Sequence, residues 1–457
     1  MRERVLLAGD MARDDAIADG IDAELHVAMR HYHPGLINKA LRSGGDFHIV
    51  ENLENGRVLG ELALETKATL AIVTRDTSLT NGVVDDLRSI NPDLKIVGPN
   101  RWYSRLEGDK YHARQKIDQI DPSLNPRFRK AVTAKQVDEA IGEFEYLSLE
   151  AAVKPINPAG GRGVRVMGKN LRNFDDAKRY AKQIIRLENQ EGVLIEQALK
   201  GIEFNLNILT DGQMSIVPVV TVDYPYRDDG DIGPPTGGMG SFAFAPGELP
   251  PFMSEDDFDK AFNFSKKLIE NAQAEYASEI GDGQRYNGWL YPNFIMTDEG
   301  LKVIEINVRP GDPEWMNLRQ ITDPNVDMVD VYSRVATGQL REEDIRFLGQ
   351  ASVAQYFVPA SYARNQGDKP VEFNLDWEAL NQHDVSVYFS SAEKQGDHYR
   401  TIGSSRPVAF TATGDKPWDA RGKILDARSD GGPAELESRN EIGQKEYVNS
   451  RKDPRAT

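Results

Sequence analysis

The chain has no cysteine, no long apolar run and no excess of basic residues, and each absence excludes a class of function. Without cysteine there is no disulfide framework, no thiolate nucleophile and no zinc–thiolate site. No apolar run approaches the roughly 18–20 residues that a membrane-spanning helix needs, and the charged start from Met1 to Arg4 is unlike a signal peptide. We therefore expect a cytoplasmic protein with no membrane partner.

Acidic residues outnumber basic ones by 72 to 55, which gives a formal net charge of −17. Because nucleic-acid binding draws on a basic surface to release counterions, we expect no nucleic-acid partner. A small anion can still bind a locally positive cleft. At 457 residues, with 39 Gly and 24 Pro, the chain is expected to form an α/β protein of two to four domains.

The first hundred residues predict a parallel sheet. Apolar runs that are typical of buried strands lie at 5–9, 68–73 and 94–97. Strands that alternate with helical segments form sheets whose ligands lie beyond the carboxyl ends of the strands. Arg13, Arg75 and Asp76 fall at that edge and are candidates for a substrate pocket; the alternative is that these side chains are only solvated. Of a Gly-x-Gly-x-x-Gly fingerprint only Gly9 is present, which excludes dinucleotide binding there.

The strand pattern at 303–309 places polar side chains in a row. Alternation predicts one face toward a core, with Ile304, Ile306 and Val308, and an opposite face with Val303, Glu305, Asn307 and Arg309. A carboxylate and an amide oxygen two residues apart suit Mg²⁺ or Mn²⁺, which leaves its other positions to water and phosphate. Glu305 and Asn307 are therefore candidate metal ligands. The alternative is an edge strand with a solvated polar face.

A glycine-rich hairpin follows Lys154. Its tip contains Gly160, Gly161, Arg162 and Gly163. Glycines let a backbone approach phosphate oxygens, and Lys154 and Arg162 add charge. The sequence Gly-Lys-[Ser/Thr] of a Walker A loop is missing, and the hairpin runs into a strand instead of a helix. We interpret it as a phosphate flap, with an ordinary turn as the alternative.

Residues 223–241 hold so much Gly, Pro and Asp that neither a helix nor a strand is expected. Long ordered loops inside a domain are usually functional. The run Thr236, Gly237, Gly238, Met239 and Gly240 could offer backbone N–H groups to a carboxylate or an acyl phosphate. A flexible surface loop is the alternative.

The second half of the chain predicts further elements. These are a helix capped by Ser254 and ending near 278, a hairpin of strands at 288–296 and 301–308, and strands at 351–358, 385–389 and 408–412. The last three strands indicate a small β-rich domain. From 429 onward the chain is polar with few aromatic residues, so we expect a disordered tail.

These segments, in this order, resemble the glycinamide ribonucleotide synthetases (phosphoribosylamine–glycine ligases), a family of ATP-grasp enzymes. The resemblance runs from about Val5 to Asp426 and is most specific at 230–240 and 303–314. The family patterns there are close to Gly-Asp-x-Gly-Pro-Asn-Thr-Gly-Gly-Met-Gly and Val-Ile-Glu-Phe-Asn-x-Arg-Phe-Gly-Asp-Pro-Glu. The resemblance implies a Rossmann-like domain at 1–105, an ATP-grasp domain at 106–340 with its flap at 121–192, a small domain at 341–428 and a tail at 429–457.

The resemblance also implies a reaction. The γ-phosphoryl group of ATP passes to a substrate carboxylate, and an amine attacks the resulting acyl phosphate. The implied catalytic residues are Arg309, Asp223 and Lys154, and the implied metal ligands are Glu305 and Asn307 with a further carboxylate that the sequence does not identify. The implied ATP-binding residues are Arg114, Lys154, Gly160, Gly161, Arg162, Gly163, Glu196, Gln197, Leu199 and Glu203. The implied substrate-binding residues are Arg13, Asp76, Thr236, Gly237, Gly238, Met239, Gly240, Arg309, Gly311 and Asp312.

Departures from the family concentrate in the half that would hold phosphoribosylamine. Where the family reads Gly-Ser-Gly-Gly-Arg-Glu-His, residues 9–15 read Gly-Asp-Met-Ala-Arg-Asp-Asp, which keeps Arg13 but loses two glycines and brings in two aspartates beside it. The family's Asp-His-Lys-Arg becomes Asp-Tyr-Pro-Tyr at 223–226, without the two cations. Three readings stay open: the glycine ligase itself, a related ligase with another amine or carboxylate, and an inactive nucleotide-binding regulator. A monomer or a homodimer is expected.

Overall fold

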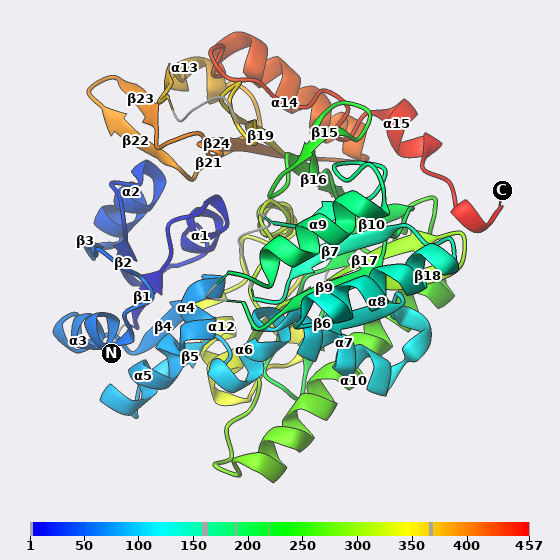
Figure 1. The fold of residues 1–457 in the computed structure, drawn as a ribbon. Coiled ribbons are helices and arrows are strands. Elements are labelled where there is room, and N and C mark those ends of the chain that lie inside the picture. The colour runs from blue at the N-terminus through cyan, green and yellow to red at the C-terminus, as the bar shows by residue number, and fades with distance from the viewer. Residues whose placement is uncertain (1–2, 158–162, 188–189, 218, 365–368, 457) are drawn as a thin grey trace.

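The computed structural model describes residues 3–157, 163–187, 190–217, 219–364 and 369–456. Its N-terminal part is a five-stranded sheet surrounded by helices, with strand order β3-β2-β1-β4-β5 (Figure 1). Every pairing in it is parallel, which confirms the parallel sheet expected from the sequence. The strands are β1 (Arg4–Ala8), β2 (Glu24–Met29), β3 (Phe47–Ile49), β4 (Leu70–Val73) and β5 (Lys95–Val97), and the helices are α1 (Ala12–Ala18), α2 (Pro34–Ser43), α3 (Gly56–Glu65), α4 (Asp76–Asn81) and α5 (Val83–Ile90).

A ten-stranded antiparallel sheet forms the centre of the molecule, in the order β12-β11-β17-β10-β13-β16-β19-β24-β21 with β18 beside β17. Because β16 pairs with β19, strands from both sides of residue 340 belong to one sheet. The resemblance places a domain boundary at this residue. The strands are β10 (Ile202–Leu206), β11 (Ile208–Thr210), β12 (Ser215–Ile216), β13 (Val220–Asp223), β16 (Gly240–Ala243), β17 (Gly288–Thr297), β18 (Gly300–Asn307), β19 (Ala351–Phe357), β21 (Ser386–Phe389) and β24 (Val408–Gly414).

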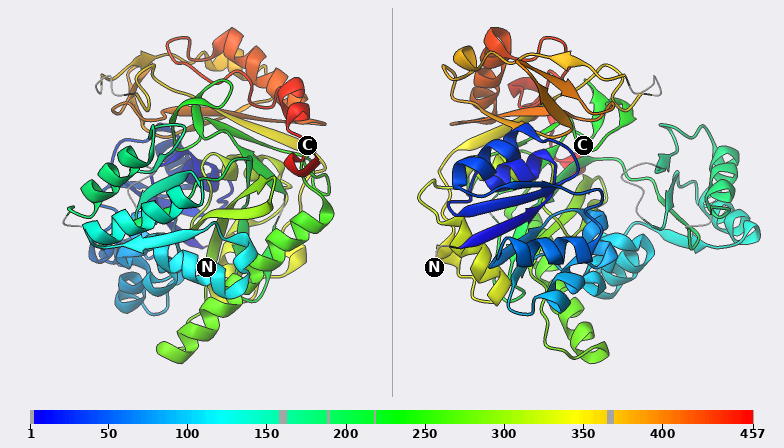
Figure 2. Two further views of the ribbon diagram at one scale, coloured as in Figure 1. Left: turned by 45° about the vertical axis from the view of Figure 1, so that its right-hand side comes forward. Right: turned by 90° about the vertical axis from the view of Figure 1, so that its left-hand side faces the viewer.

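The segment assigned to the flap is a separate small layer. Its four-stranded sheet, β6-β9-β7-β8, has its own hydrophobic core with the two helices that pack on it. In the right-hand view of Figure 2 it projects away from the rest of the molecule. The elements are β6 (Phe128–Ala131), α8 (Ala134–Tyr146), β7 (Ala151–Pro155), β8 (Arg165–Val166), α9 (Phe174–Ile184) and β9 (Val193–Gln197). The strand that was expected to follow the glycine-rich hairpin is β8.

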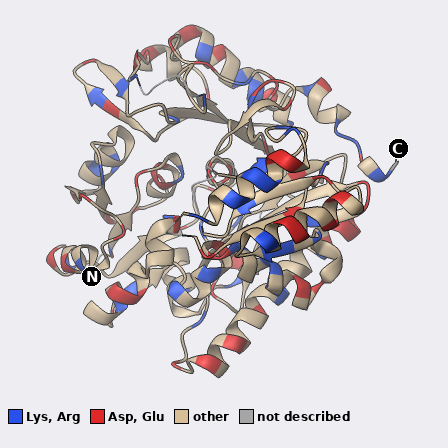
Figure 3. Cartoon of the chain, viewed as in Figure 1, with Lys and Arg blue, Asp and Glu red and all other residues tan. Residues whose placement is uncertain are grey.

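The remaining elements cover the large sheet and join the layers. They are α6 (Arg101–Gly108), α7 (Lys110–Ile120), α10 (Glu255–Glu279), α11 (Glu314–Ile321), α12 (Met328–Thr337), α13 (Trp377–Leu380), α14 (Pro417–Gly431), α15 (Lys445–Ser450) and a small sheet of β20 (Glu372–Phe373), β22 (Ala392–Gln395) and β23 (His398–Thr401). Ser254 caps α10 as expected, since its hydroxyl accepts a hydrogen bond from the N–H of Asp257. Among the described residues, no helix is long and apolar enough to cross a membrane. Acidic and basic residues are interspersed over the helices in Figure 3.

The expectation of a disordered tail is wrong. Within the described chain up to residue 456, the tail packs on the loop region that follows β13, and it contains α15. Arg439 is fully buried and donates to Asp231, which also accepts from the Tyr447 hydroxyl at 2.6 Å and from Arg451 at 3.1 Å. The composition is polar because this segment is held by ion pairs and hydrogen bonds in addition to a few apolar side chains.

The expectation that 223–241 holds no strand is also wrong. A small antiparallel hairpin forms from β14 (Tyr226–Asp228) and β15 (Ile232–Pro235). Its turn places Gly230 at φ +78° and Asp231 at φ +55°, in the left-handed region that favours Gly, Asn and Asp. The residue types that argued against a strand are therefore the ones that close the turn.

A β-bulge changes the predicted faces of the strand at 303–309. Asn293 pairs with Glu305 while Phe294 pairs with Val303, so Ile304 is the extra residue. Val303 lies in the core and Ile304 lines a cavity, which reverses the sequence prediction for these two residues. Beyond the bulge, Val308 lies in the core and Glu305, Asn307 and Arg309 line the cavity, as predicted, whereas Ile306 belongs to the core and also lines the cavity.

Candidate active site

A cavity of about 610 Å³ is lined by residues of the N-terminal sheet, the flap and the large sheet. It brings together side chains that are far apart in the sequence. The predicted site residues that line it are Arg13, Asp76, Arg114, Lys154, Glu196, Glu203, Asp223, Thr236, Gly237, Glu305, Asn307, Arg309 and Asp312. The predicted residues that do not line it are Gly163, Gln197, Leu199, Gly238, Met239, Gly240 and Gly311. Gly160, Gly161 and Arg162 lie outside the described residues.

Three side-chain oxygens gather on the paired strands β17 and β18. Glu305 and Asn307 lie on β18, and Asn293 faces Glu305 from β17. The Asn293 Oδ1 atom is buried and has no hydrogen-bond partner in the described part of the chain. Since a buried amide oxygen is costly to leave unpaired, it fits a ligand that completes its coordination. Sequence reasoning missed Asn293, because a regular hairpin places it opposite Ile304 and only the bulge brings it opposite Glu305.

This oxygen set fits a hard divalent cation that keeps several non-protein ligands. Asn307 is oriented by three neighbours: its Nδ2 donates to the Tyr291 carbonyl at 3.3 Å and to Glu305 Oε1 at 3.5 Å, and its Oδ1 accepts from Arg309 Nη2 at 3.3 Å. No group of three or more His, Cys, Asp or Glu residues that could hold a metal is found among the described residues. The set is therefore one carboxylate supported by amides, not a carboxylate cluster.

Arg309 lies beside this set and is held by Glu107 at the end of α6. Its Nε lies 3.3 Å from Glu107 Oε1, and Glu107 Oε2 accepts from the N–H of Val308 at 2.8 Å. Burial opposes the charge of Arg309, but the carboxylates of Glu107 and Asp76 outweigh it and raise the pKa of Arg309. Arg309 is thus a fixed cation with a defined orientation in the cavity.

Lys154 and Arg114 meet on one buried carboxylate, that of Glu196. Lys154 Nζ lies 2.6 Å from Glu196 Oε2, and Arg114 Nε lies 2.6 Å from Oε1. Although burial works against ionisation, Arg114 and Lys154 lower the pKa of Glu196 to about 2. The carboxylate of Glu196 is therefore occupied by two cations, which leaves the predicted ATP contact of this residue to its backbone.

All five N–H groups of Arg114 have partners within the protein. Besides Glu196, these are Asn125 Oδ1 and the carbonyls of Val303 and Ile304 at the bulge of β18. A phosphate contact by Arg114, as the resemblance implies, would have to replace one of these bonds. Lys110, one helical turn earlier, lines the same cavity, and no hydrogen bond to its Nζ is found among the described residues. Burial and the neighbouring Lys154 lower its pKa.

Two buried carboxyl groups, Asp223 and Glu314, lie on the other side of the cavity. Burial raises the pKa of both, and the negative charge of Glu314 raises that of Asp223 further. Glu314 Oε1 accepts from the Tyr291 hydroxyl at 2.9 Å, whereas its Oε2 is buried without a partner among the described residues. No ion pair to either carboxyl group is found among the described residues, although the charge of Arg406 acts on Asp223 and that of Arg309 on Glu314.

The N–H groups of the segment 236–240 do not form the open row that the sequence predicts. Those of Thr236, Gly237, Gly238 and Met239 donate to the Pro225 carbonyl, the Tyr362 hydroxyl, the Thr236 hydroxyl and the Tyr224 carbonyl, respectively. Arg406 holds the same segment by donating to the carbonyls of Gly237 and Gly238. Its Nη2 also lies 3.3 Å from Asp312 Oδ2. Arg406 was not among the predicted site residues. It binds this segment and adds a cation to the cavity.

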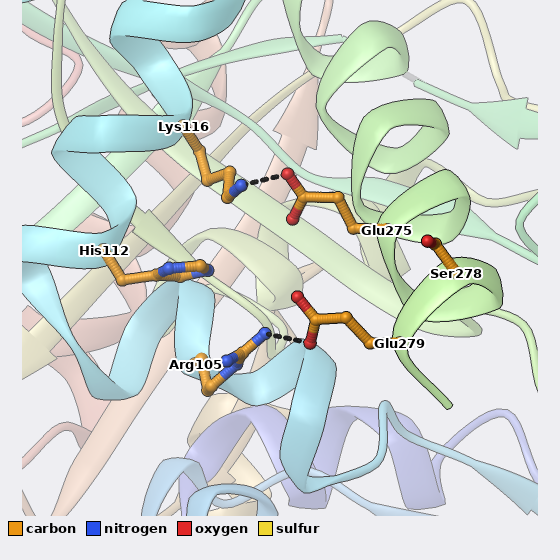
Figure 4. Close-up of a pocket in the computed structure, with 6 residues that line it drawn as sticks. All are labelled: Arg105, His112, Lys116, Glu275, Ser278 and Glu279. Carbon is orange, nitrogen blue, oxygen red and sulfur yellow. Dashed lines mark hydrogen bonds and ion pairs between the residues drawn. The ribbon is translucent and has the colours of Figure 1, made fainter. Parts of the chain in front are cut away.

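A second cavity of about 350 Å³ lies between α7 and the C-terminal end of α10 (Figure 4). Its charged side chains are paired across it: Lys116 with Glu275, and Arg105 Nη2 with Glu279 Oε2 at 3.8 Å. His112 lies between these pairs, and burial lowers its pKa. Because the charges neutralise one another, this cavity offers no group for catalysis comparable with the first one.

The parallel N-terminal sheet, the projecting flap and the oxygen row on a strand of the large sheet together define an ATP-grasp fold. The family described as "Phosphoribosylglycinamide synthetase, ATP-grasp (A) domain" matches residues 108–315. Among solved structures, the biotin carboxylase domain of 2-oxoglutarate carboxylase from Hydrogenobacter thermophilus aligns over 100% of this chain and 97% of its own. The TM-score is 0.71 at 16% identity, which shows the shared fold.

Full-length relatives narrow the class to one family. The phosphoribosylamine–glycine ligase of Methanopyrus kandleri is 32% identical over 98% of this chain and 97% of its own length. The structure of the phosphoribosylamine–glycine ligase of Thermotoga maritima has a TM-score of 0.72 at 21% identity, covering 96% of this chain and 100% of that one. The chain belongs to the phosphoribosylamine–glycine ligase family.

Proposed function

We propose that the protein joins glycine to 5-phosphoribosylamine at the expense of ATP, through a glycyl phosphate intermediate. The observation that carries this proposal is the single cavity in which the oxygen row of β18, two lysines and a set of arginines face one another. The oxygen row and the two lysines fit a nucleoside triphosphate, and the arginines fit a carboxylate and a phosphorylated amine. Family membership supports the reaction.

ATP would lie between the flap and the large sheet, with Lys154 and Lys110 toward its phosphates. Residues 196–199 would contact the adenine through their backbone, and Glu203 would contact the ribose. Burial raises the pKa of Glu203 to about 7, and Glu305 contributes to the rise. A neutral Glu203 carboxyl could both donate to and accept from a ribose hydroxyl.

Glu305, Asn307 and Asn293 would hold a divalent cation, which we propose to be Mg²⁺. When bound, it supplies positive charge that neutralises the phosphate oxygens during transfer. The protein's own contribution is to hold the oxygen row in place, since Arg309 orients Asn307 and Arg114 fixes the carbonyls of the bulge. Little covalent chemistry is asked of the protein, whose main contribution is positioning and electrostatic stabilisation.

In the first step a carboxylate oxygen of glycine attacks the γ-phosphorus, the bond to the β,γ-bridging oxygen breaks, and ADP leaves. In the second step the amine nitrogen attacks the acyl carbon, inorganic phosphate leaves, and the nitrogen loses a proton. Arg309 and Arg406 would hold the carboxylate. The buried pair Asp223 and Glu314 would receive the ammonium group of glycine, because Glu314 Oε2 is buried without a hydrogen-bond partner among the described residues and an ammonium group would supply one.

Coupled ADP release tests this function. With ATP, Mg²⁺ and glycine, we expect ADP only when freshly generated phosphoribosylamine is present. Release with another amine in its place would indicate a related ligase, and no release with any amine would indicate a nucleotide-binding protein. We further propose a cytoplasmic monomer or homodimer, which sedimentation of the purified protein tests as far as assembly is concerned.

A further inference from the structure

The altered N-terminal segment raises the question of what holds the phosphate of the amine substrate. Three arginines, one from each of three strand ends, line the same cavity: Arg13 beyond β1, Arg30 directly after β2 and Arg75 beyond β4. These strands are neighbours in the order β2-β1-β4 and run parallel, so their carboxyl ends meet at one edge. The cations therefore gather although the glycines of the family segment are missing.

Asp10 connects two of these arginines. Arg30 approaches it with Nε at 2.6 Å and Nη2 at 2.9 Å, while Arg75 Nη1 lies 3.5 Å from Asp10 Oδ1. The Asp10 side chain is fully buried beneath them. Burial opposes its ionisation, but Arg30, His31 and Arg75 outweigh that effect and lower the pKa of Asp10. Asp10 is therefore an ionised support that orients two guanidinium groups.

Both guanidinium groups keep unused donors. Arg30 Nη1 and Arg75 Nη2 have no partner in the part of the chain that the structure describes, whereas Arg75 Nε donates to the Thr77 hydroxyl at 3.0 Å. A guanidinium group can bind one anion along one edge and a second anion along another edge. Arg13 differs, because its side chain is buried and its Nη2 donates to the Thr74 carbonyl.

The aspartates that the sequence placed beside Arg13 do not block this edge. Asp15 is ion-paired with Lys39 at 2.7 Å and accepts from the N–H of Phe389. Asp14 accepts from the Thr74 hydroxyl at 2.5 Å and from the N–H of Met11 at 2.8 Å. Neither of them lines the cavity.

We propose that Arg30 and Arg75, oriented by Asp10, bind the phosphate group of the amine substrate, beside the segment in which two glycines of the family pattern are missing. The proposal rests on the proposed function for the identity of the amine. Arg75 precedes Asp76, and Asp76 lines the cavity together with Arg309, so the phosphate end and the acyl end of the reaction share one space. Ser391 and Ser405 line the same cavity from the C-terminal part of the chain.

Calorimetric titration of the full-length protein with ribose 5-phosphate, and with ribose as the comparison, tests the site without any turnover. We expect ribose 5-phosphate to bind more tightly than ribose, and Arg30→Gln and Arg75→Gln each to weaken its binding about 10-fold to 100-fold. Arg57→Gln is the matched control, since Arg57 lies on an exposed helix face of the same domain and pairs only with Glu61 in the described structure. Equal binding of ribose 5-phosphate by wild type and both variants would overturn the proposal.

Asp10→Asn separates orientation from bulk charge. It makes the site more positive, so a site that works through charge alone would bind ribose 5-phosphate more tightly. A site that depends on oriented guanidinium groups would bind it several-fold more weakly, which is the expected result. Tighter binding overturns the role of Asp10.

Turnover distinguishes this proposal from the proposed function. If wild type uses phosphoribosylamine, the two arginine variants should raise its KM about tenfold or more and leave the KM for ATP unchanged. An unchanged KM for the amine overturns the site but leaves the function intact. If wild type does not use phosphoribosylamine but its binding of ribose 5-phosphate still depends on Arg75, the site stands and the proposed amine is wrong.

Discussion

Arg114 and Glu196 form a buried, doubly hydrogen-bonded ion pair that ties the flap strand β9 to the bulge of β18. The two residues are 3% and 2% exposed, and Arg114 reaches on to the carbonyls of Val303 and Ile304. One arginine thus links the part of the site that would cover ATP to the part that would hold the metal. The nucleotide contacts and the metal contacts lie in separate segments of the sequence, but in the structure one side chain joins them.

Glu196→Gln should destabilise the protein strongly. It leaves Arg114 and Lys154 without a counter-charge in a buried site, for which a loss of about 3–5 kcal/mol in the free energy of unfolding is expected. Glu143→Gln is the matched control, because Glu143 also pairs with two arginines but on the flap surface, and its loss should be about 1 kcal/mol or less. Urea unfolding of both variants checks the prediction, and similar losses would contradict it.

The same pair sets the acid limit of stability. The folded pKa of Glu196 is about 2, below the value of about 4.3 in an unfolded chain. Its stabilising contribution is therefore present above about pH 4.3 and is lost as the pH falls toward 2. The free energy of unfolding of wild type should decline through this window, and the difference between wild type and Glu196→Gln should shrink there.

Glu305→Gln should abolish ADP formation and leave the fold intact. Glu305 is exposed to the cavity and is the one carboxylate of the oxygen row, so its loss weakens cation binding without opening the core. A fall in kcat of at least about 100-fold is expected. Glu299→Gln, in the exposed turn of the same hairpin, should behave as wild type. Unchanged turnover in Glu305→Gln would contradict the assignment of Glu305 as a metal ligand.

The outcome for β18 shows where sequence reasoning reaches its limit. The alternation of apolar and polar residues was sufficient to predict which face Glu305, Asn307 and Arg309 occupy. It was wrong for Val303 and Ile304, because a one-residue bulge inverts every face on one side of it. The bulge carbonyls bond to Arg114, which is 189 residues away from Val303 in the chain, so no local pattern announces it.

The C-terminal tail and the proposed phosphate site of Arg30 and Arg75 also show what sequence reasoning could not predict. A polar composition predicted disorder at 429–457, but Arg439 is buried there because Asp231 and Glu441 neutralise it. Likewise the departures at residues 9–15 suggested a weakened phosphate pocket. Only the adjacency of β2, β1 and β4 shows that Arg30 joins Arg75 at the same edge.

Asp223→Asn should stabilise the protein at alkaline pH while it impairs catalysis. Burial and the charge of Glu314 raise the pKa of Asp223 above its unfolded value, so wild type loses stability as the pH rises above about 4, where the unfolded chain ionises this group and the folded chain resists. The variant removes that loss. The difference in the free energy of unfolding, variant minus wild type, should therefore grow as the pH rises above about 4. Asp298→Asn, in an exposed turn, should show no such trend.

Catalysis by Asp223→Asn gives the complementary result. If Asp223 and Glu314 receive the ammonium group of glycine, the variant should raise the KM for glycine about tenfold or more and leave the KM for ATP unchanged. A lower kcat with an unchanged KM for glycine would instead indicate that Asp223 acts only after glycine has bound.

Asp231→Asn should loosen the C-terminal tail. Asp231 sits at the turn of the β14–β15 hairpin and is bound by Arg439, Tyr447 and Arg451 of the tail, so it fastens the tail to the segment that leads into the site. Asn tolerates the positive φ of this position as Asp does, so the variant removes the charge without straining the turn. A loss of about 1 kcal/mol in the free energy of unfolding is expected, because the side chain is partly exposed.

Trypsin should cleave the Asp231→Asn variant after Arg439 or Arg451 faster than it cleaves wild type. The control is Asp229→Asn, whose partner in the tail is the uncharged Asn440, and it should be cleaved at the wild-type rate. Equal cleavage of Asp231→Asn and wild type would show that the apolar contacts of the tail hold it without this turn.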